Sequence, residues 1–332
     1  MTKRELVFKA FGNEPVERVP VGFWFHFLEF DQFNMALDYP ELLEKVIEGH
    51  KKYRDDFDPD FVKMMTDGLF MRPRTSYPPV NCPKDLYKIK RLPEDHRYFE
   101  YSVKQAKAVR ALFDKDVPVF FNIFSPLFHF THMLNGNDDL SRTSAFLFEE
   151  PEAVVYALDV ISQDLCYMTD RVIEEAGLDG IYLSVNNGGR VIREDLYKKY
   201  ISPSEEKVLA EANSFTKHNI LHICGWRGRT NIISCYRDYD AEVFNWAVHE
   251  EGLSLKAGKE YFHGKAVIGG FNQQQGELIN VGSREAIQAE VDNILRESGT
   301  TGVIIGADCT VPADTPIEHL IWAREQASKY HS

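Results

Sequence analysis

The sequence predicts an α/β fold, a (β/α)8 TIM barrel formed by one domain over residues 1–332. Short runs rich in β-branched or aromatic residues alternate with longer amphipathic runs, which is typical of parallel βα units. Eight such units follow one another in about 300 residues, the usual size of this barrel. A doubly wound open sheet is the alternative, but no Gly-x-Gly-x-x-Gly follows the first predicted strand to support a dinucleotide site.

Each predicted strand is flanked by glycine, proline, aspartate or asparagine. In chain order the strands are Arg18–Phe27, Phe57–Met65, Val117–Ile123, Gly180–Val185, Ile220–Cys224, Ala241–Trp246, Lys265–Gly269 and Gly302–Ala307.

Apolar residues at spacings of three and four predict the helices between these strands. They are Tyr39–Tyr53, Tyr98–Phe113, Pro151–Ala176, Glu205–Lys217, Gly252–Phe262, Ser283–Glu297 and Pro316–Tyr330. Pro151 and Pro316 stand where proline starts a helix. The segment after the fifth strand, Thr230–Tyr236, is only weakly helical.

Residues 70–93 interrupt the alternation with five prolines and with Arg72 and Arg74 close together. A segment of this length without regular structure is typical of a functional loop. It predicts a loop over the barrel mouth or a contact between the subunits of a homodimer.

Charge and composition narrow the function classes. Lys plus Arg total 38 against 51 Asp plus Glu, a net charge of −13, so nucleic acid is not an expected partner. No run of ~20 uncharged apolar residues predicts a membrane span, and the charged N-terminus does not resemble a signal peptide. The five cysteines are too few and too scattered for a disulfide framework, which favours a reducing cytoplasm.

Three soft metal ligands stand out. His222 and Cys224 lie two positions apart in Leu221–Gly225, and Cys309 follows the last predicted strand. Three protein ligands with a fourth position open are typical of catalytic zinc, whereas structural zinc usually has four protein ligands. The trio therefore suggests a zinc ion with one exchangeable position.

The predicted fold places this trio in one region. Barrel active sites gather at the carboxyl ends of the strands, and all three residues fall there. His222 and Cys224 share one side of their strand because strand side chains alternate. Two alternatives remain: isolated cysteines are often simply buried, and Cys235 is a competing third ligand, although its weakly helical segment favours a structural thiol.

Several segments resemble the uroporphyrinogen decarboxylase superfamily over nearly the whole chain. The resemblance rests on Arg4-Glu5 and on the segments Phe11–Val21, Glu175–Ile181, Leu221–Gly225, Val267–Phe271 and Thr315–Leu320. It implies a (β/α)8 barrel and one of two chemistries.

The first chemistry is metal-free decarboxylation of a porphyrinogen in haem synthesis. That branch uses two arginines of an Arg-Gln-Ala-Gly-Arg motif after the first strand, and this chain has Gly22–Phe27 there, without arginine. Asp67 is the apparent counterpart of the branch's characteristic aspartate, so we expect a catalytic role for it, or else a turn before Gly68. The missing arginine pair disfavours an octacarboxylate substrate.

The second chemistry is methyl transfer between a corrinoid and a thiol such as coenzyme M, and its zinc motif is His-x-Cys followed far downstream by Cys. The resemblance assigns zinc to His222, Cys224 and Cys309, in agreement with the ligand chemistry. No Asp-x-His-x-x-Gly corrinoid signature occurs, so the corrinoid would arrive free or on a separate protein. A small methylated substrate is the alternative to a thiol, and a non-catalytic barrel that binds a corrinoid or metabolite is a third class.

Positions at strand ends give the remaining candidates for substrate binding, because binding groups accumulate there. These are Phe23, Trp24, His26, His129, Asn186 and Asn187. An aromatic run is more often core than ligand wall, and Asn-Gly is often only a turn.

Overall fold

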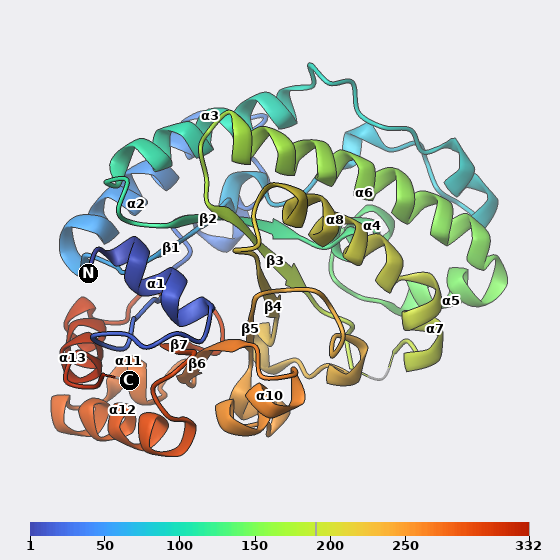
Figure 1. Ribbon diagram of the computed structural model, residues 1–332. Helices are drawn as coiled ribbons and strands as arrows, with labels where there is room; N and C mark the ends of the chain where they lie inside the picture. The colour runs from blue at the N-terminus through green and yellow to red at the C-terminus, as the bar shows by residue number, and fades with distance from the viewer. Residues whose placement is uncertain (190, 332) are drawn as a thin grey trace.

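Seven parallel strands form one sheet in the computed structural model, which describes residues 1–189 and 191–331 (Figure 1). Their order in the sheet is their order in the chain. The strands are β1 (Val62–Met64), β2 (Val119–Phe124), β3 (Gly180–Val185), β4 (Ile220–Ile223), β5 (Val243–Trp246), β6 (Ala266–Phe271) and β7 (Val303–Ala307). The predicted α/β class with a parallel sheet is confirmed.

The first predicted strand, Arg18–Phe27, forms only a single parallel bridge between Val21 and Ile305 of β7. On its other side, toward β1, the Val21 N–H donates to the buried carboxylate of Asp60, 2.9 Å away, and Asp60 also binds Arg18. A side chain thus takes the place of a backbone ladder there. Of the eight predicted strands, the described part of the chain forms seven and this bridge.

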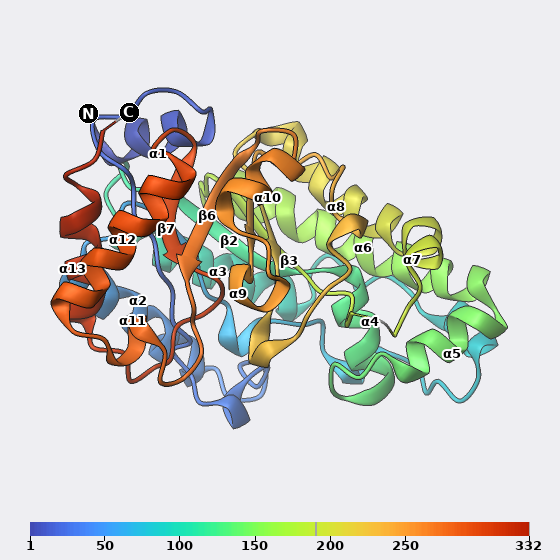
Figure 2. The same cartoon turned by 90° about the horizontal axis from the view of Figure 1, so that it is seen from below.

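Helices cover the outside of the sheet, with α2, α3, α6 and α8 along one part and α10, α12 and α13 along the other (Figures 1 and 2). The helices are α1 (Lys3–Phe11), α2 (Glu41–Phe57), α3 (Arg97–Leu112), α4 (Pro126–Asn135), α5 (Ser141–Glu149), α6 (Pro151–Glu174), α7 (Glu194–Tyr200), α8 (Ser202–Phe215), α9 (Val248–Glu251), α10 (Leu255–Tyr261), α11 (Leu278–Val281), α12 (Arg284–Ser298) and α13 (Ile317–Ala327). None of these described helices combines the length and apolarity needed to span a bilayer.

Alternation along the strands creates two apolar cores. On β1, Val62 and Met64 belong to the large core between sheet and helices. Phe61 and Met65, one residue further along on each side, belong to the core on the inner face of the sheet. Lys63 is therefore expected to face inward.

Helix α1 covers the amino ends of the strands. Thr2 and Glu5 form a capping box that begins the helix. Its buried side chains join the inner core, and the Phe11 ring lies 5.7 Å from that of Phe120 near the start of β2. The amino end is thus closed by apolar packing, and the carboxyl end is left for a site.

The proline-rich segment 70–93 is tied to α6 by a buried ion pair. Arg72 Nη1 lies 2.6 Å from Asp164 Oδ2, and both side chains are almost fully buried. Asp164 also accepts from the Leu92 N–H, so one carboxylate fastens both ends of the segment. Breaking such a pair typically costs about 3–5 kcal/mol. The ion pair therefore fixes the conformation of a segment whose regular structure consists of short 3-10 turns.

Candidate metal centre

His222, Cys224 and Cys309 come together at the carboxyl end of the sheet. One ligand atom from each lies within 4.8 Å of the others. The Cys309 sulfur is 3.7 Å from the Cys224 sulfur and 3.4 Å from His222 Nε2. His222 is on β4, Cys224 follows that strand, and Cys309 follows β7. Cys235 is buried and is not part of this group.

These spacings fit tetrahedral zinc coordination. Bonds of about 2.3 Å to sulfur and about 2.0–2.1 Å to nitrogen at tetrahedral angles separate two sulfurs by about 3.8 Å, and sulfur from nitrogen by about 3.5 Å. The observed 3.7 and 3.4 Å lie close to both values. Two thiolates and an imidazole are also the ligand types that zinc prefers. The donor set therefore fits a zinc ion with a fourth position free.

Asn245 of β5 orients the imidazole of His222. The two residues are register partners on neighbouring strands, and His222 Nδ1 hydrogen-bonds Asn245 Oδ1. The Asn245 amide nitrogen donates to the carbonyls of Ile268 (2.9 Å) and Ala307 (3.2 Å), so its oxygen must be the acceptor. His222 Nδ1 consequently carries the proton, and the lone pair of Nε2 faces the cysteines.

The protonation of the trio follows from burial and proximity. Burial lowers the pKa of His222, which favours the neutral imidazole that binds metals. The contact between the two sulfurs lowers the pKa of Cys224 and raises that of Cys309, because one ionised sulfur disfavours ionisation of its neighbour. Metal binding requires both sulfurs as thiolates, so a metal ion would displace the proton from a protonated Cys309.

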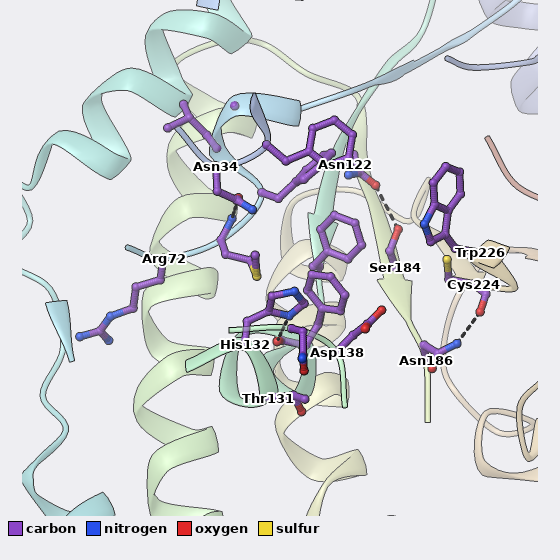
Figure 3. A pocket seen from close by; sticks show the side chains of 18 of the residues that line it. Asn34, Arg72, Asn122, Thr131, His132, Asp138, Ser184, Asn186, Cys224 and Trp226 are labelled. Atoms are coloured by element: carbon purple, nitrogen blue, oxygen red, sulfur yellow. Dashed lines mark hydrogen bonds between the residues drawn. The ribbon is translucent and has the colours of Figure 1, made fainter. Parts of the chain in front are cut away.

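A cavity of about 1030 Å³ opens at the trio. His222, Cys224 and Cys309 form part of its wall, together with Lys63, Asn122 and Trp226. Figure 3 shows Cys224, Trp226 and Asn186 on one side of the cavity and Arg72 on the opposite side, with its side chain pointing outward. Residues 70–75 of the proline-rich segment also line it. The space far exceeds the volume of a small thiol.

Residues 61–330 match the sequence profile described as "Uroporphyrinogen decarboxylase (URO-D)". The chain belongs to the uroporphyrinogen decarboxylase family. No curated protein sequence matches it.

Solved structures share the fold of this uroporphyrinogen decarboxylase family member. A methyltransferase from Methanosarcina mazei superimposes with a TM-score of 0.76 at 17% sequence identity, covering 99% of each chain. A B12-independent methionine synthase from Shewanella sp. W3-18-1, in complex with selenomethionine, gives 0.56 at 11% identity, covering 94% of this chain and 98% of the other. At these identities the likeness concerns the fold.

Two of the residues expected to bind substrate line the cavity of this family member. His26 is in the wall, with its ring 5.1 Å from that of Trp226. Asn186 is also in the wall, and its amide donates to the Cys224 carbonyl, which holds the backbone at Cys224 in place. Asn187 is fully buried. Its amide nitrogen donates to the Ile232 carbonyl, and its amide oxygen accepts from the Ile232 N–H.

Asp67 does not line the cavity. It is fully buried and accepts from the backbone N–H groups of Phe27 and Leu28, and it also contacts His26 Nδ1 at 2.9 Å. Three hydrogen-bonding groups already surround the carboxylate. Its contacts therefore hold the segment after Val21 in place and orient His26. The structural alternative expected for Asp67 was a turn before Gly68, whereas its carboxylate contacts a different segment, at Phe27 and Leu28.

Phe23, Trp24 and His129 also lie outside the cavity wall. Phe23 packs in the outer core against Phe57 and Phe271. His129 is buried in α4, where its Nδ1 accepts from the Arg72 N–H. Trp24 contacts the trio from outside the cavity, with its ring edge-on to that of His222 and the ring centres 6.0 Å apart. A strand-end position did not reveal which way these side chains turn.

Two residues of this site were missed from the sequence, Asn245 and Lys63. Each is the one polar residue of a short run that is otherwise apolar, in Val-Phe-Asn-Trp and Phe-Val-Lys-Met. A buried polar group costs free energy unless it is satisfied, so such an interruption was an available signal of function.

Proposed function

We propose that the chain is a zinc-dependent methyltransferase that moves a methyl group between a corrinoid and a thiol or small methylated substrate. The observation that carries the proposal is the tetrahedral spacing of His222, Cys224 and Cys309 in the wall of a large cavity. Membership of the uroporphyrinogen decarboxylase family and the fold shared with a methyltransferase support it.

In this proposal zinc, when bound, supplies a positive charge that favours the thiolate over the thiol form of the substrate. His222, Cys224 and Cys309 hold the ion, and Asn245 keeps His222 in the ligating tautomer. The thiol releases its proton, its sulfur bonds to the methyl carbon, and the electron pair of the broken bond stays with the methyl donor.

The volume of the cavity supports a second reactant beside the thiol. The sequence carries no corrinoid-binding signature, so the corrinoid is proposed to come free or from a separate protein. A corrinoid held in the mouth of the cavity would bring its methyl group toward the trio while most of the macrocycle stays outside.

Porphyrinogen decarboxylation is disfavoured by two observations. The segment Gly22–Phe27 has no arginine, and the nearby Asp67 carboxylate is enclosed by Phe27, Leu28 and His26. A carboxylate without access to the cavity cannot contact a substrate there.

The proposal is tested by incubating zinc-loaded protein with methylcobalamin and a panel of small thiols. We expect loss of methylcobalamin absorbance together with a methyl thioether detected by mass spectrometry. Cys309→Ala should abolish transfer, and Cys235→Ala, which removes a buried thiol outside the trio, should retain it. Transfer that persists in Cys309→Ala would contradict the proposed mechanism. Zinc-loaded protein that transfers to no thiol would shift the proposal to the small methylated substrate.

A further inference from the structure

Lys63 places a positive charge inside the sheet beside the metal centre. It is the middle residue of β1, and it is only 5% exposed. Its side chain lines the same cavity as Cys224 and Cys309. A buried lysine is rare unless a partner compensates its charge.

The surroundings of Lys63 stabilise the ammonium without neutralising it. The Nζ atom lies 4.2 Å from the ring centre of Tyr182 and 4.7 Å from that of Trp24, and both ring faces attract cations. Among residues 1–189 and 191–331, no carboxylate forms an ion pair with it and no hydrogen bond to Nζ is present. Its three N–H donors therefore remain available toward the cavity.

The charged groups around Lys63 are few. Cys309 and Cys224 exert the largest charge effects on it, followed by Asp67, whose carboxylate is already engaged by His26 and two backbone N–H groups. His222 is the remaining titratable neighbour, and the ammonium favours its neutral form. Tyr182 stays neutral because burial raises its pKa well above the usual range. Burial lowers the pKa of Lys63 itself to about 8, and the two cysteines oppose this shift.

The charge of Lys63 influences which fourth ligand a metal ion at the trio would prefer. A divalent ion with two thiolates and a neutral imidazole has no net charge, and Lys63, which is almost fully buried, then leaves one positive charge beside the ion. An anionic fourth ligand cancels this charge, whereas a neutral ligand does not. Opposite charges attract strongly where water is excluded.

We propose that Lys63 is a positioning residue that makes an anionic group, the thiolate of the substrate, the preferred fourth ligand of the metal centre. This inference rests on the proposed function, because it presupposes a metal at the trio. It goes further in assigning the preference for the ionised thiol to a residue that does not bind the metal.

The test compares an anionic and a neutral probe on zinc-loaded protein by isothermal titration calorimetry. 2-Mercaptoethanol, which binds as its thiolate, is the anionic probe, and imidazole is the neutral one. Lys63→Met removes the charge at similar size, Lys63→Arg keeps it, and Lys259→Met removes a lysine charge at the amino end of β7, where Lys259 contacts Thr301. Zinc content and thermal unfolding of each variant establish that the site is intact.

We expect Lys63→Met to weaken thiol binding by roughly 10- to 100-fold, the size of a desolvated charge interaction, while imidazole binding stays the same or improves. The number of protons released per thiol bound, obtained from two buffers of different ionisation enthalpy, should fall in Lys63→Met near neutral pH. Lys63→Arg and Lys259→Met should resemble wild type.

Equal weakening for both probes would reduce Lys63 to a structural role and overturn the inference, as would thiol binding unchanged in Lys63→Met. If Lys63→Met does not fold, Lys63→Gln provides the same comparison. Wild-type protein that holds no zinc would overturn the proposed function as well. Wild-type protein that binds zinc and thiol without discrimination by Lys63 would overturn this inference alone.

Discussion

His222 donates its Nδ1 proton to the side-chain oxygen of Asn245, its register partner on the neighbouring strand. The Asn245 amide cannot turn around, because its nitrogen already donates to two backbone carbonyls. One neutral residue outside the ligand trio thus selects the tautomer that can bind a metal.

Replacing Asn245 should therefore weaken metal binding. Asn245→Leu removes the acceptor at similar size, and we expect a loss of about 10- to 100-fold in zinc affinity, measured by competition with a chromogenic chelator. Asn245→Asp keeps an acceptor and should lose less. Equal zinc affinity in wild type and Asn245→Leu would show that the hydrogen bond does not tune the site.

Zinc affinity should also rise with pH. The raised pKa of Cys309 means that zinc must displace its proton, so each pH unit below that pKa costs about tenfold in apparent affinity. Chelator competition at several pH values around neutrality, corrected for the chelator's own protonation, measures this slope. An affinity independent of pH over this range would contradict the assignment of Cys309 as a ligand.

Asp67→Asn should destabilise the fold. Asp67 accepts two backbone hydrogen bonds and contacts His26, and the amide places a donor against one of these groups. We expect a loss of about 2–3 kcal/mol in the free energy of unfolding, measured by urea denaturation. The exposed control Asp116→Asn should change it little. Loss of activity with unchanged stability would instead indicate a catalytic carboxylate.

The stability of the protein should depend on the ionisation of Glu205. This residue is fully buried, and two tyrosine hydroxyls, of Tyr197 and Tyr239, donate to its carboxyl group. Burial raises its pKa from 4.5 to about 7, so between these values the folded protein binds more protons than the unfolded chain. The free energy of unfolding should consequently fall as pH rises through this range, by about 3 kcal/mol.

Glu205→Gln removes this titration. Urea denaturation at pH 5 and pH 8 should show a smaller fall for Glu205→Gln than for wild type, with the exposed control Glu260→Gln behaving as wild type. Parallel pH dependence in wild type and Glu205→Gln would mean that Glu205 is not the group responsible.

Much of the fold follows from local pattern. The prediction of Gly180–Val185 coincides with β3, and Pro151 does begin α6. The first strand could not be foreseen as a single bridge, because its neighbour on one side is a carboxylate, Asp60, which lies far away in sequence. Closure of a sheet depends on such contacts between residues distant in sequence, and local sequence patterns do not predict these contacts.

The site residues that could be predicted are those whose combination of residue types is rare. Those that could not be predicted are of residue types found in many settings. Three soft ligands at strand ends predict a metal site because few other functions use this set, and the structure brings the three side chains together. Asn245 and Lys63 were missed because one polar residue within an apolar strand has many explanations until its neighbours are known. Asp67 and His129 followed strands as expected, but both turn into the protein.

Every prediction about methyl transfer depends on the proposal that His222, Cys224 and Cys309 bind one zinc ion. Its most direct test is the zinc content of protein purified without chelator, measured by inductively coupled plasma mass spectrometry. We predict about one equivalent in wild type and in the matched control Cys235→Ala, and little in Cys224→Ala and Cys309→Ala. Less than about half an equivalent in wild type, or zinc content unchanged in Cys224→Ala, would contradict it.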